Sequence, residues 1–345
     1  MPATREILPT SNLPEHSIPP KPTWQQALAA AIRDVPTLLN RLNLPTSACG
    51  ALPEDPSGFP VLVPESYLAR MRSGDPDDPL LRQVLPVQAE RETQPDFLTD
   101  PVGDHSSRLA PGLLHKYQGR ALLIAHGSCA VHCRYCFRRH FPYQQEPRSE
   151  TDWEPAFALL QADKSIHEVI LSGGDPLILS DRRLNLLVRR LADIPHIRRL
   201  RIHSRLPIVL PERVTDSLCH LLTHGRLQSI FVVHANHAQE LQADCADALG
   251  LLRRSGIPVL NQAVLLRNVN DSLQSLAELC ERCVDLGVIP YYLHQLDRVQ
   301  GAAHFEVAQS VGRALIEELR QQLPGYAVPK YVVELAGAPS KVPIL

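Results

Sequence analysis

Short apolar runs and amphipathic stripes alternate along the last two-thirds of the chain, from about residue 119 onward. The apolar runs that predict strands are Arg120–Ala125, Glu168–Leu171, Arg199–His203, Ile230–His234, Val259–Leu266, Val288–Leu293 and Tyr331–Leu335. Between them, apolar residues recur at helical spacing, as in Leu184, Leu187, Val188 and Leu191. Strands that alternate with helices predict parallel strands joined by right-handed crossovers. We therefore expect an α/β fold, with the sheet curved into a partial or complete barrel.

The first third of the chain has a different pattern. Pro2–Pro22 is rich in proline and predicts an arm without regular structure. Trp24–Leu42 has a helical pattern that Pro36 should break into two short helices. We expect residues 1–110 to form this arm and a helical lobe, and residues 111–345 to form the barrel.

Composition limits the class of protein. The chain has 345 residues, 44% of them hydrophobic and 21% charged, which is ordinary for a soluble globular protein. A formal charge of −2 argues against a nucleic-acid surface. We expect no membrane span, because no apolar run approaches the roughly 18 residues that a spanning helix needs. The N-terminus does not resemble a signal peptide, and eight cysteines in a chain of this length are typical of a reduced, cytoplasmic protein.

Polar residues follow the predicted strands one after another. They are Cys129, Cys133 and Cys136 after the first strand, then Ser172–Pro176, His203–Arg205, His234–His237, Asn261 and Gln262, His294–Asp297, and finally Glu334 and Lys341. The carboxyl ends of parallel barrel strands meet on one face. The sequence therefore predicts a single active-site face, although each residue alone is more readily explained as structural.

The three cysteines form a C-x3-C-x2-C run within residues 126–140. A [4Fe–4S] cluster ordinarily takes four cysteines, so three would leave one iron open to an exogenous ligand such as an amino acid group. Structural zinc is the alternative, with His132 or His140 as the fourth ligand. Cys280 and Cys283 also have metal-like spacing, but they continue an apolar helical stripe and are better interpreted as core residues.

Longer motifs carry a family resemblance that runs from about residue 55 to the C-terminus. These motifs are Tyr117–Arg120, Cys136–Arg139, Leu171–Pro176, Arg201–Pro207, Val233–His237, Leu260–Gln262, Pro290–Asp297 and Tyr331–Glu334. Together they resemble the lysine 2,3-aminomutase family of radical S-adenosylmethionine enzymes. The resemblance implies a partial (β/α)6-type TIM barrel and three cofactors: a [4Fe–4S] cluster, S-adenosylmethionine and pyridoxal 5′-phosphate.

The resemblance also implies a role for each matching residue. Cys129, Cys133 and Cys136 would bind the cluster, and the open iron would hold S-adenosylmethionine. The stretch of Ser172, Gly173, Gly174 and Asp175 resembles the glycine-rich segment that contacts the methionyl amino group of this cofactor. Pyridoxal phosphate would be held by Lys341, Gln262, Tyr117 and Arg120. Arg138 would clamp the carboxylate of L-lysine, and Asp297 and Glu334 would receive its distal ammonium.

Two departures from the family pattern affect these expectations. Most glycines before the family's pyridoxal lysine are replaced here, in Ala336–Lys341, and Glu334 stands where the family usually has aspartate. The chain stops four residues after Lys341, as in a short branch of the family whose product β-lysine is attached by a partner ligase to elongation factor P. That branch implies a monomer or small homo-oligomer and a reductant protein. The alternatives are a related enzyme for another amino acid, such as glutamate, and a non-catalytic zinc module.

Overall fold

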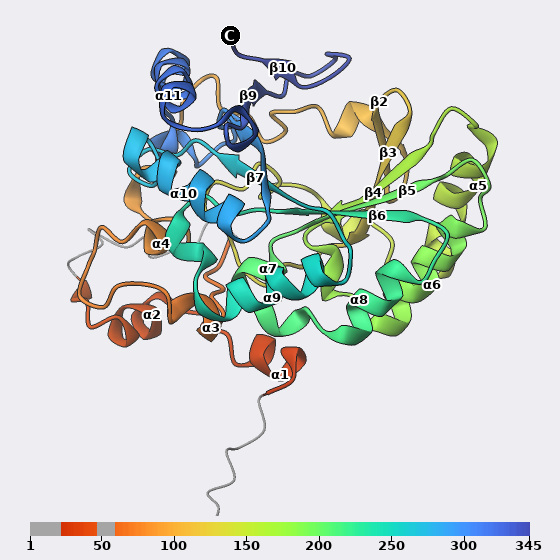
Figure 1. The fold of residues 1–345 in the computed structure, drawn as a ribbon, viewed down its shortest axis with the longest axis horizontal. Coiled ribbons are helices and arrows are strands. Elements are labelled where there is room, and N and C mark those ends of the chain that lie inside the picture. Colours follow the sequence, from red (N-terminus) through yellow and green to blue (C-terminus); the bar gives the residue numbers. More distant parts are fainter. Residues whose placement is uncertain (1–21, 47–58) are drawn as a thin grey trace, which may run out of the picture.

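The computed structural model describes residues 22–46 and 59–345 (Figure 1). The predicted arm before Pro22, together with Cys49, lies outside the described residues. Within the described part, the strands form one ten-stranded sheet in which they follow one another in chain order. Seven of them are parallel: β3 (Arg120–His126), β4 (Glu168–Gly173), β5 (Arg199–Ser204), β6 (Gln228–Val233), β7 (Val259–Val264), β8 (Ile289–His294) and β9 (Lys330–Val333).

Helices connect successive parallel strands and cover the outer side of the sheet (Figure 1). They are α5 (Glu154–Ala162), α6 (Asp181–Ala192), α7 (Leu206–Val209), α8 (Asp216–Thr223), α9 (Ala243–Arg254), α10 (Leu273–Asp285) and α11 (Gln309–Gln322). With six strand-to-strand crossovers and no pairing between β1 and β10, the partial (β/α)6-type barrel is confirmed. Among the described residues no helix is both long and apolar enough to cross a membrane.

The amphipathic stripes read from the sequence face the core. The stripe of α6, Leu184, Leu187, Val188 and Leu191, is buried as predicted. On α10, Cys280 and Cys283 are only 3% and 0% exposed and belong to the hydrophobic core, as predicted. Gly287 follows the C-cap residue Leu286 of α10 and has a positive φ of 70°, which is typical of a glycine at this position.

The N-terminal helices are α1 (Trp24–Ala29), α2 (Val35–Arg41), α3 (Glu65–Leu68) and α4 (Pro79–Arg82). Pro36 lies in the first turn of α2, where a missing N–H removes no helical bond, and Asp34 caps that turn by accepting from the Thr37 N–H at 2.8 Å. The predicted break is thus confirmed. Apolar side chains of these helices, such as Leu38 and Leu80, belong to the same core cluster as the barrel. The domain boundary at residue 110 stays a prediction.

Three short strands and one cap differ from the sequence-based expectation. β1 (Arg108–Ala110) and β2 (Leu113–Tyr117) form a hairpin on the edge of β3, and β10 (Val342–Pro343) folds back antiparallel on β9. These strands have two to five residues, too few to show an alternating pattern. Before the helical stripe of α10, the sequence suggests Asp271 as the helix cap; this prediction is wrong by one residue, because Ser272 accepts from the Ser275 N–H instead.

We predict that Gly312→Ala destabilises the fold. An added Cβ at this α11 position would overlap the ring and hydroxyl of Tyr331 on β9, whose hydroxyl donates to Gln295. Overpacking costs about 1–3 kcal/mol, more than the roughly 1 kcal/mol that alanine gains in a helix. Denaturant unfolding should show a lower free energy of unfolding for this variant. Gly325→Ala, which meets no atom within 4 Å, is the control, and equal losses in both variants would contradict the packing argument.

Candidate active site

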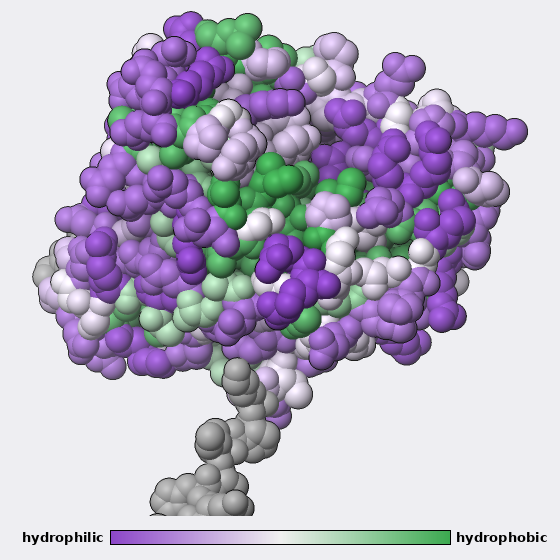
Figure 2. Space-filling model, viewed as in Figure 1, coloured by the Kyte–Doolittle hydropathy of each residue, from purple (hydrophilic) through white to green (hydrophobic). Residues whose placement is uncertain are grey.

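A cavity of about 1200 Å³ runs through the inside of the barrel. Half-buried apolar side chains of the strands form part of its wall, among them Leu122, Ile170, Ile230 and Leu260. In the view of Figure 1, apolar side chains gather at the centre of the molecule and polar ones surround them (Figure 2). The cavity brings together all of the site residues expected from the sequence: Tyr117, Arg120, Cys129, Cys133, Cys136, Arg138, Ser172, Gly173, Gly174, Asp175, Gln262, Asp297, Glu334 and Lys341.

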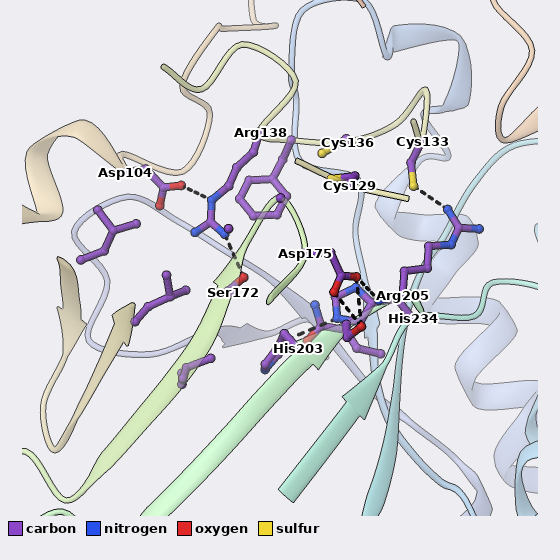
Figure 3. A pocket seen from close by; sticks show the side chains of 18 of the residues that line it. Asp104, Cys129, Cys133, Cys136, Arg138, Ser172, Asp175, His203, Arg205 and His234 are labelled. Atoms are coloured by element: carbon purple, nitrogen blue, oxygen red, sulfur yellow. Dashed lines mark hydrogen bonds and ion pairs between the residues drawn. The ribbon is translucent and has the colours of Figure 1, made fainter. Parts of the chain in front are cut away.

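The three cysteines lie on the loop that follows β3 (Figure 3). Burial raises the pKa of the Cys129 thiol well above its usual value, and the nearby Cys136 and Cys133 raise it further. Burial and Cys133 likewise raise the pKa of Cys136 to about 11. Neighbouring thiols with raised pKa values become thiolates when a cation binds them. The donor set therefore fits a metal centre.

A single ion and an iron–sulfur cluster place different demands on the spacing of these thiols. Among the residues that the structure describes, no three His, Cys, Asp or Glu side chains are placed to hold one metal ion, His132 and His140 included. Zinc needs all of its donors within about 2.0–2.3 Å of one centre. A [4Fe–4S] cluster instead takes one thiolate on each of several irons, so its cysteines stand further apart.

The N-terminal segment holds the cysteine loop in place. Glu90 accepts from Arg134 Nε at 2.8 Å and from Arg139 Nη2 at 2.7 Å, and all three side chains are buried. The backbone N–H of Arg134 also donates to the Gln83 carbonyl at 2.8 Å. These bonds fix the two arginines, which belong to the cysteine loop itself, and the charge of Arg139 lowers the pKa of Cys136 against the effect of burial.

Gly173 at the end of β4 and Gly174 directly after it allow close packing against the end of β3 and the start of the cysteine loop. A Cβ on Gly173 would overlap the His126 carbonyl oxygen, and one on Gly174 would overlap that of Ser128. Gly173 also has a φ of 126°, a conformation that side chains rarely adopt. The Gly174 N–H donates to His126 O at 2.8 Å. The sequence suggested that this glycine segment contacts a ligand. The structure shows that the two glycines are also needed for the backbone here to pack against His126 and Ser128.

The Asp175 carboxylate is occupied by protein groups. It accepts from the Leu177 N–H at 3.0 Å, the Arg205 N–H at 2.8 Å and the Ser204 hydroxyl at 2.8 Å. Burial nevertheless raises its pKa to about 6. Asp175 thus joins the loops after β4 and β5, and its predicted contact with a cofactor stays a prediction.

Arg138 extends from the cysteine loop into the cavity (Figure 3). Its Nε donates to Asp104 Oδ2 at 2.7 Å and its Nη1 to the Ser172 hydroxyl at 3.2 Å. No acceptor among the described residues bonds Nη2, so the guanidinium keeps a donor for a further anion. Arg138 is 7% exposed, and such a partly desolvated guanidinium is well suited to bind a carboxylate.

Lys341 reaches the same cavity from the opposite end of the sheet. The hairpin of β9 and β10 brings its Nζ to 2.6 Å from Glu334 Oε2. Lys116, on β2, places its own Nζ 3.0 Å from Glu334 Oε1. Burial alone would raise the pKa of Glu334, but the two ammonium groups hold it well below its usual range. Glu334 is therefore ionised and held at both oxygens.

Two further side chains of the cavity wall carry polar atoms that form no hydrogen bond with the described residues. Asp297 Oδ1 and Gln262 Oε1 are buried without a hydrogen-bond partner among the described residues. Burial and the negative charge of Glu334 raise the pKa of Asp297 to about 7. Because buried polar atoms are normally paired, these atoms indicate a polar ligand. Arg120 lies 4.6 Å from the centre of the Tyr117 ring, where it shields one side of the cavity.

Sequence reasoning missed Asp104 and Lys116, which link Arg138 to Glu334. Asp104 is in a turn-rich segment before the barrel, outside every motif. Lys116 belongs to β2, a strand too short for its pattern to be recognised. The one available signal was a lysine in an otherwise apolar stretch, and that signal is weak.

Comparison with known proteins gives a family model, curated relatives and solved structures that resemble this chain. The Radical SAM superfamily model matches residues 123–280, from β3 into α10. The chain is 47% identical to the L-lysine 2,3-aminomutase of Escherichia coli over 94% of its length and 95% of that protein. It is 36% identical to the L-lysine 2,3-aminomutase of Clostridium subterminale over 81% of its length and 67% of that protein. The chain also resembles the solved structure of Streptococcus suis SuiB bound to precursor peptide SuiA. The match covers 64% of this chain and 50% of the SuiB chain, with 14% identity and a TM-score of 0.48.

A barrel with three clustered cysteines and this superfamily match defines a radical S-adenosylmethionine protein. Within that class, the chain belongs to the lysine 2,3-aminomutase family of isomerases. The cofactor set expected from the sequence, a [4Fe–4S] cluster, S-adenosylmethionine and pyridoxal phosphate, is the set that this family implies.

We predict that Gly173→Ala lowers the iron content of the protein after anaerobic reconstitution. The added Cβ would push the β4 loop from the cysteine loop, at a backbone cost of about 1–3 kcal/mol. Gly256→Ala is the matched control, because that glycine has a φ of 80° but no atom near its Cβ. Iron analysis should separate the two variants; wild-type iron in both would contradict the packing role.

We predict a pH-dependent stability effect at Asp297. In the folded protein its pKa is about 7, whereas an unfolded aspartate titrates at about pH 4. Between these values the native state binds more protons, so the free energy of unfolding falls as pH rises. Asp297→Asn should remove this loss, and its advantage over wild type should be larger at pH 8 than at pH 5 in denaturant unfolding without cofactors. The exposed Asp285→Asn is the control, and a pH-independent difference would oppose this explanation.

Proposed function

We propose that this protein is an L-lysine 2,3-aminomutase that converts (S)-α-lysine to β-lysine and depends on pyridoxal phosphate. The observation that carries the proposal is the shared cavity, which is lined by Cys129, Cys133 and Cys136 and also by Lys341. A radical source and a carbonyl cofactor must both reach one substrate in this reaction, and few arrangements would bring these residue types together for another purpose.

In this proposal, the three cysteines hold the cluster and leave one iron open for S-adenosylmethionine, and Lys341 holds pyridoxal phosphate. When bound, these groups supply a carbon-centred radical that removes a non-acidic hydrogen and a carbonyl that carries the migrating nitrogen. The protein's own contribution is to bind, orient and exclude water. Gln262, Tyr117 and Arg120 are proposed to contact pyridoxal phosphate, and the Ser172–Asp175 loop to contact S-adenosylmethionine.

Arg138 and Asp297 are proposed to orient the two ends of lysine. The donor left on Arg138 suits the substrate carboxylate. The unpaired Oδ1 of Asp297 suits the distal ammonium, whose charge would favour the ionised carboxylate. Glu334 is proposed to complete the ammonium site. An aminomutase for glutamate is the second candidate, but its distal carboxylate would meet the carboxyl group of Asp297.

The resemblance to the short family branch supports a cellular role for the product. We propose that β-lysine is passed to a ligase that attaches it to elongation factor P, and that a reductant protein supplies the electron to the cluster. We also propose a cytoplasmic monomer or small homo-oligomer that binds neither nucleic acid nor membrane. Light scattering checks the oligomeric state, and a large assembly would contradict it.

Product analysis tests the proposed reaction. Enzyme reconstituted with cluster, S-adenosylmethionine, pyridoxal phosphate and reductant should convert L-lysine to β-lysine. Lys341→Ala should retain iron but lose turnover by several orders of magnitude, because the attachment point for pyridoxal phosphate is gone. Lys330→Ala, an exposed lysine on β9, is the control. Turnover of glutamate but not lysine would favour the second candidate, and a colourless protein with bound zinc would exclude both.

A further inference from the structure

One cysteine of the loop after β3 shares a hydrogen bond with a buried arginine. Arg205, directly after β5, directs its Nη1 at the Sγ atom of Cys133 at a distance of 2.6 Å (Figure 3). The Arg205 side chain is buried, and both residues line the cavity. Among the described residues, no other guanidinium donates to a sulfur atom of this loop. A fixed positive charge therefore contacts one of the three thiols directly.

The other terminal nitrogen of this guanidinium is held by protein acceptors. Arg205 Nη2 donates to Glu240 Oε2 at 2.8 Å and to Gln83 Oε1 at 2.7 Å. Glu240 is fully buried, and its Oε1 accepts from the Asn236 N–H at 2.9 Å. Burial alone would raise the pKa of Glu240, but Arg205 holds it below its usual value. The ionised carboxylate thus anchors Nη2, while Nη1 is directed at the sulfur.

Gln83 connects this guanidinium to the cysteine loop. Its side-chain oxygen accepts from Arg205, and its backbone carbonyl accepts from the Arg134 N–H at 2.8 Å. Arg134 is the residue directly after Cys133. Arg205 and Cys133 are therefore held next to each other by bonds between protein groups. Cluster binding removes the thiol proton of Cys133, and none of these bonds uses that proton.

A cation in this position has a predictable effect on an iron–sulfur cluster. A thiolate bound to iron keeps lone pairs that can accept a charge-assisted hydrogen bond. Net charge and hydrogen bonds to the sulfurs are among the factors that set the reduction potential of a cluster. Reduction adds one negative charge, and a buried cation nearby stabilises that charge more than it would in water. Arg205 should therefore favour the reduced cluster over the oxidised one.

We propose that Arg205 is a positioning residue that orients Cys133 and raises the reduction potential of the cluster, with Glu240 and Gln83 holding its guanidinium. The inference rests on the function proposed above only in that the loop cysteines hold the cluster, and it is independent of the substrate. The oxidised cluster gains one electron from a one-electron reductant. Arg205 shifts this equilibrium and neither gives nor takes the electron.

A redox titration of the reconstituted protein tests this role. The electron paramagnetic resonance signal of the reduced cluster, followed without S-adenosylmethionine or substrate, gives the midpoint potential. Arg205→Gln removes the charge. At a fixed solution potential we expect the ratio of reduced to oxidised cluster to fall at least about tenfold, which corresponds to about 59 mV for one electron. Arg205→Lys keeps the charge and should restore part of this shift.

Two further variants separate the charge of Arg205 from a general loss of packing. Arg70→Gln removes another buried arginine, which bonds the backbone carbonyl of Glu240 but no sulfur of the loop. Its midpoint potential should stay close to that of the wild type. Glu240→Gln removes the negative charge beside Arg205 and should raise the potential, in the direction opposite to Arg205→Gln.

A measurement on the wild-type protein covers the case in which the variants lose their iron. In protein labelled with ¹⁵N-arginine, pulsed electron paramagnetic resonance of the reduced cluster should detect a weak nitrogen coupling through the bond to Cys133. Arg205→Lys should abolish this coupling. Its absence from the wild type would overturn the proposal.

The remaining outcomes also decide between explanations. An unchanged potential in Arg205→Gln with full iron content would overturn the proposal. Lower potentials in both Arg205→Gln and Glu240→Gln, or an equal shift in Arg70→Gln, would overturn it in favour of a purely structural role. A wild-type protein that takes up no iron would instead overturn the proposed function. A cluster with the expected potentials but no turnover of lysine would overturn that function and leave this inference supported.

Discussion

The site depends on one chain of alternating charges buried inside the barrel. It begins at Arg138 on the cysteine loop and ends at Lys341 beyond the last parallel strand. Isolated buried charges would be costly, but here each carboxylate lies between two cations. The network ties together the first and last parts of the barrel, and the proposed radical source and the proposed pyridoxal lysine line the same cavity.

The rest of the fold supports the two ends of this chain. Glycine backbone at the β4 loop lets the cysteine loop pack close, and Glu90 anchors that loop through two arginines. At the other end, the short β10 strand returns the chain so that Lys341 faces Glu334. Asp297 lines the same cavity, and its Oδ1 has no hydrogen-bond partner in the part of the chain that the structure describes. The surrounding ion pairs fix the neighbouring side chains, so the Asp297 carboxylate can accept a hydrogen bond from a cationic ligand.

The sequence predicted the parallel barrel and the residues of its cavity because both leave local signals. Apolar runs and helical stripes recur at regular intervals, and residues such as Cys129 and Gln262 follow the strands that position them. Asp104 and Lys116 could not be found in this way. Asp104 lies on a turn and Lys116 on the short strand β2. Their role arises only when the fold brings Lys116 beside Glu334 and Asp104 beside Lys116 and Arg138. The ion-pair partners of Asp104 and Lys116 are distant in sequence, so a local sequence pattern cannot predict them.

A crystal structure of the enzyme with cluster, S-adenosylmethionine, pyridoxal phosphate and L-lysine bound would test the central claim most directly. The account predicts the lysine carboxylate at Arg138, its distal ammonium at Asp297, and Lys116 still between Asp104 and Glu334. A substrate bound in the reverse orientation, or a Lys116 side chain turned out of the cavity with Glu334 taking its place beside Arg138, would contradict it.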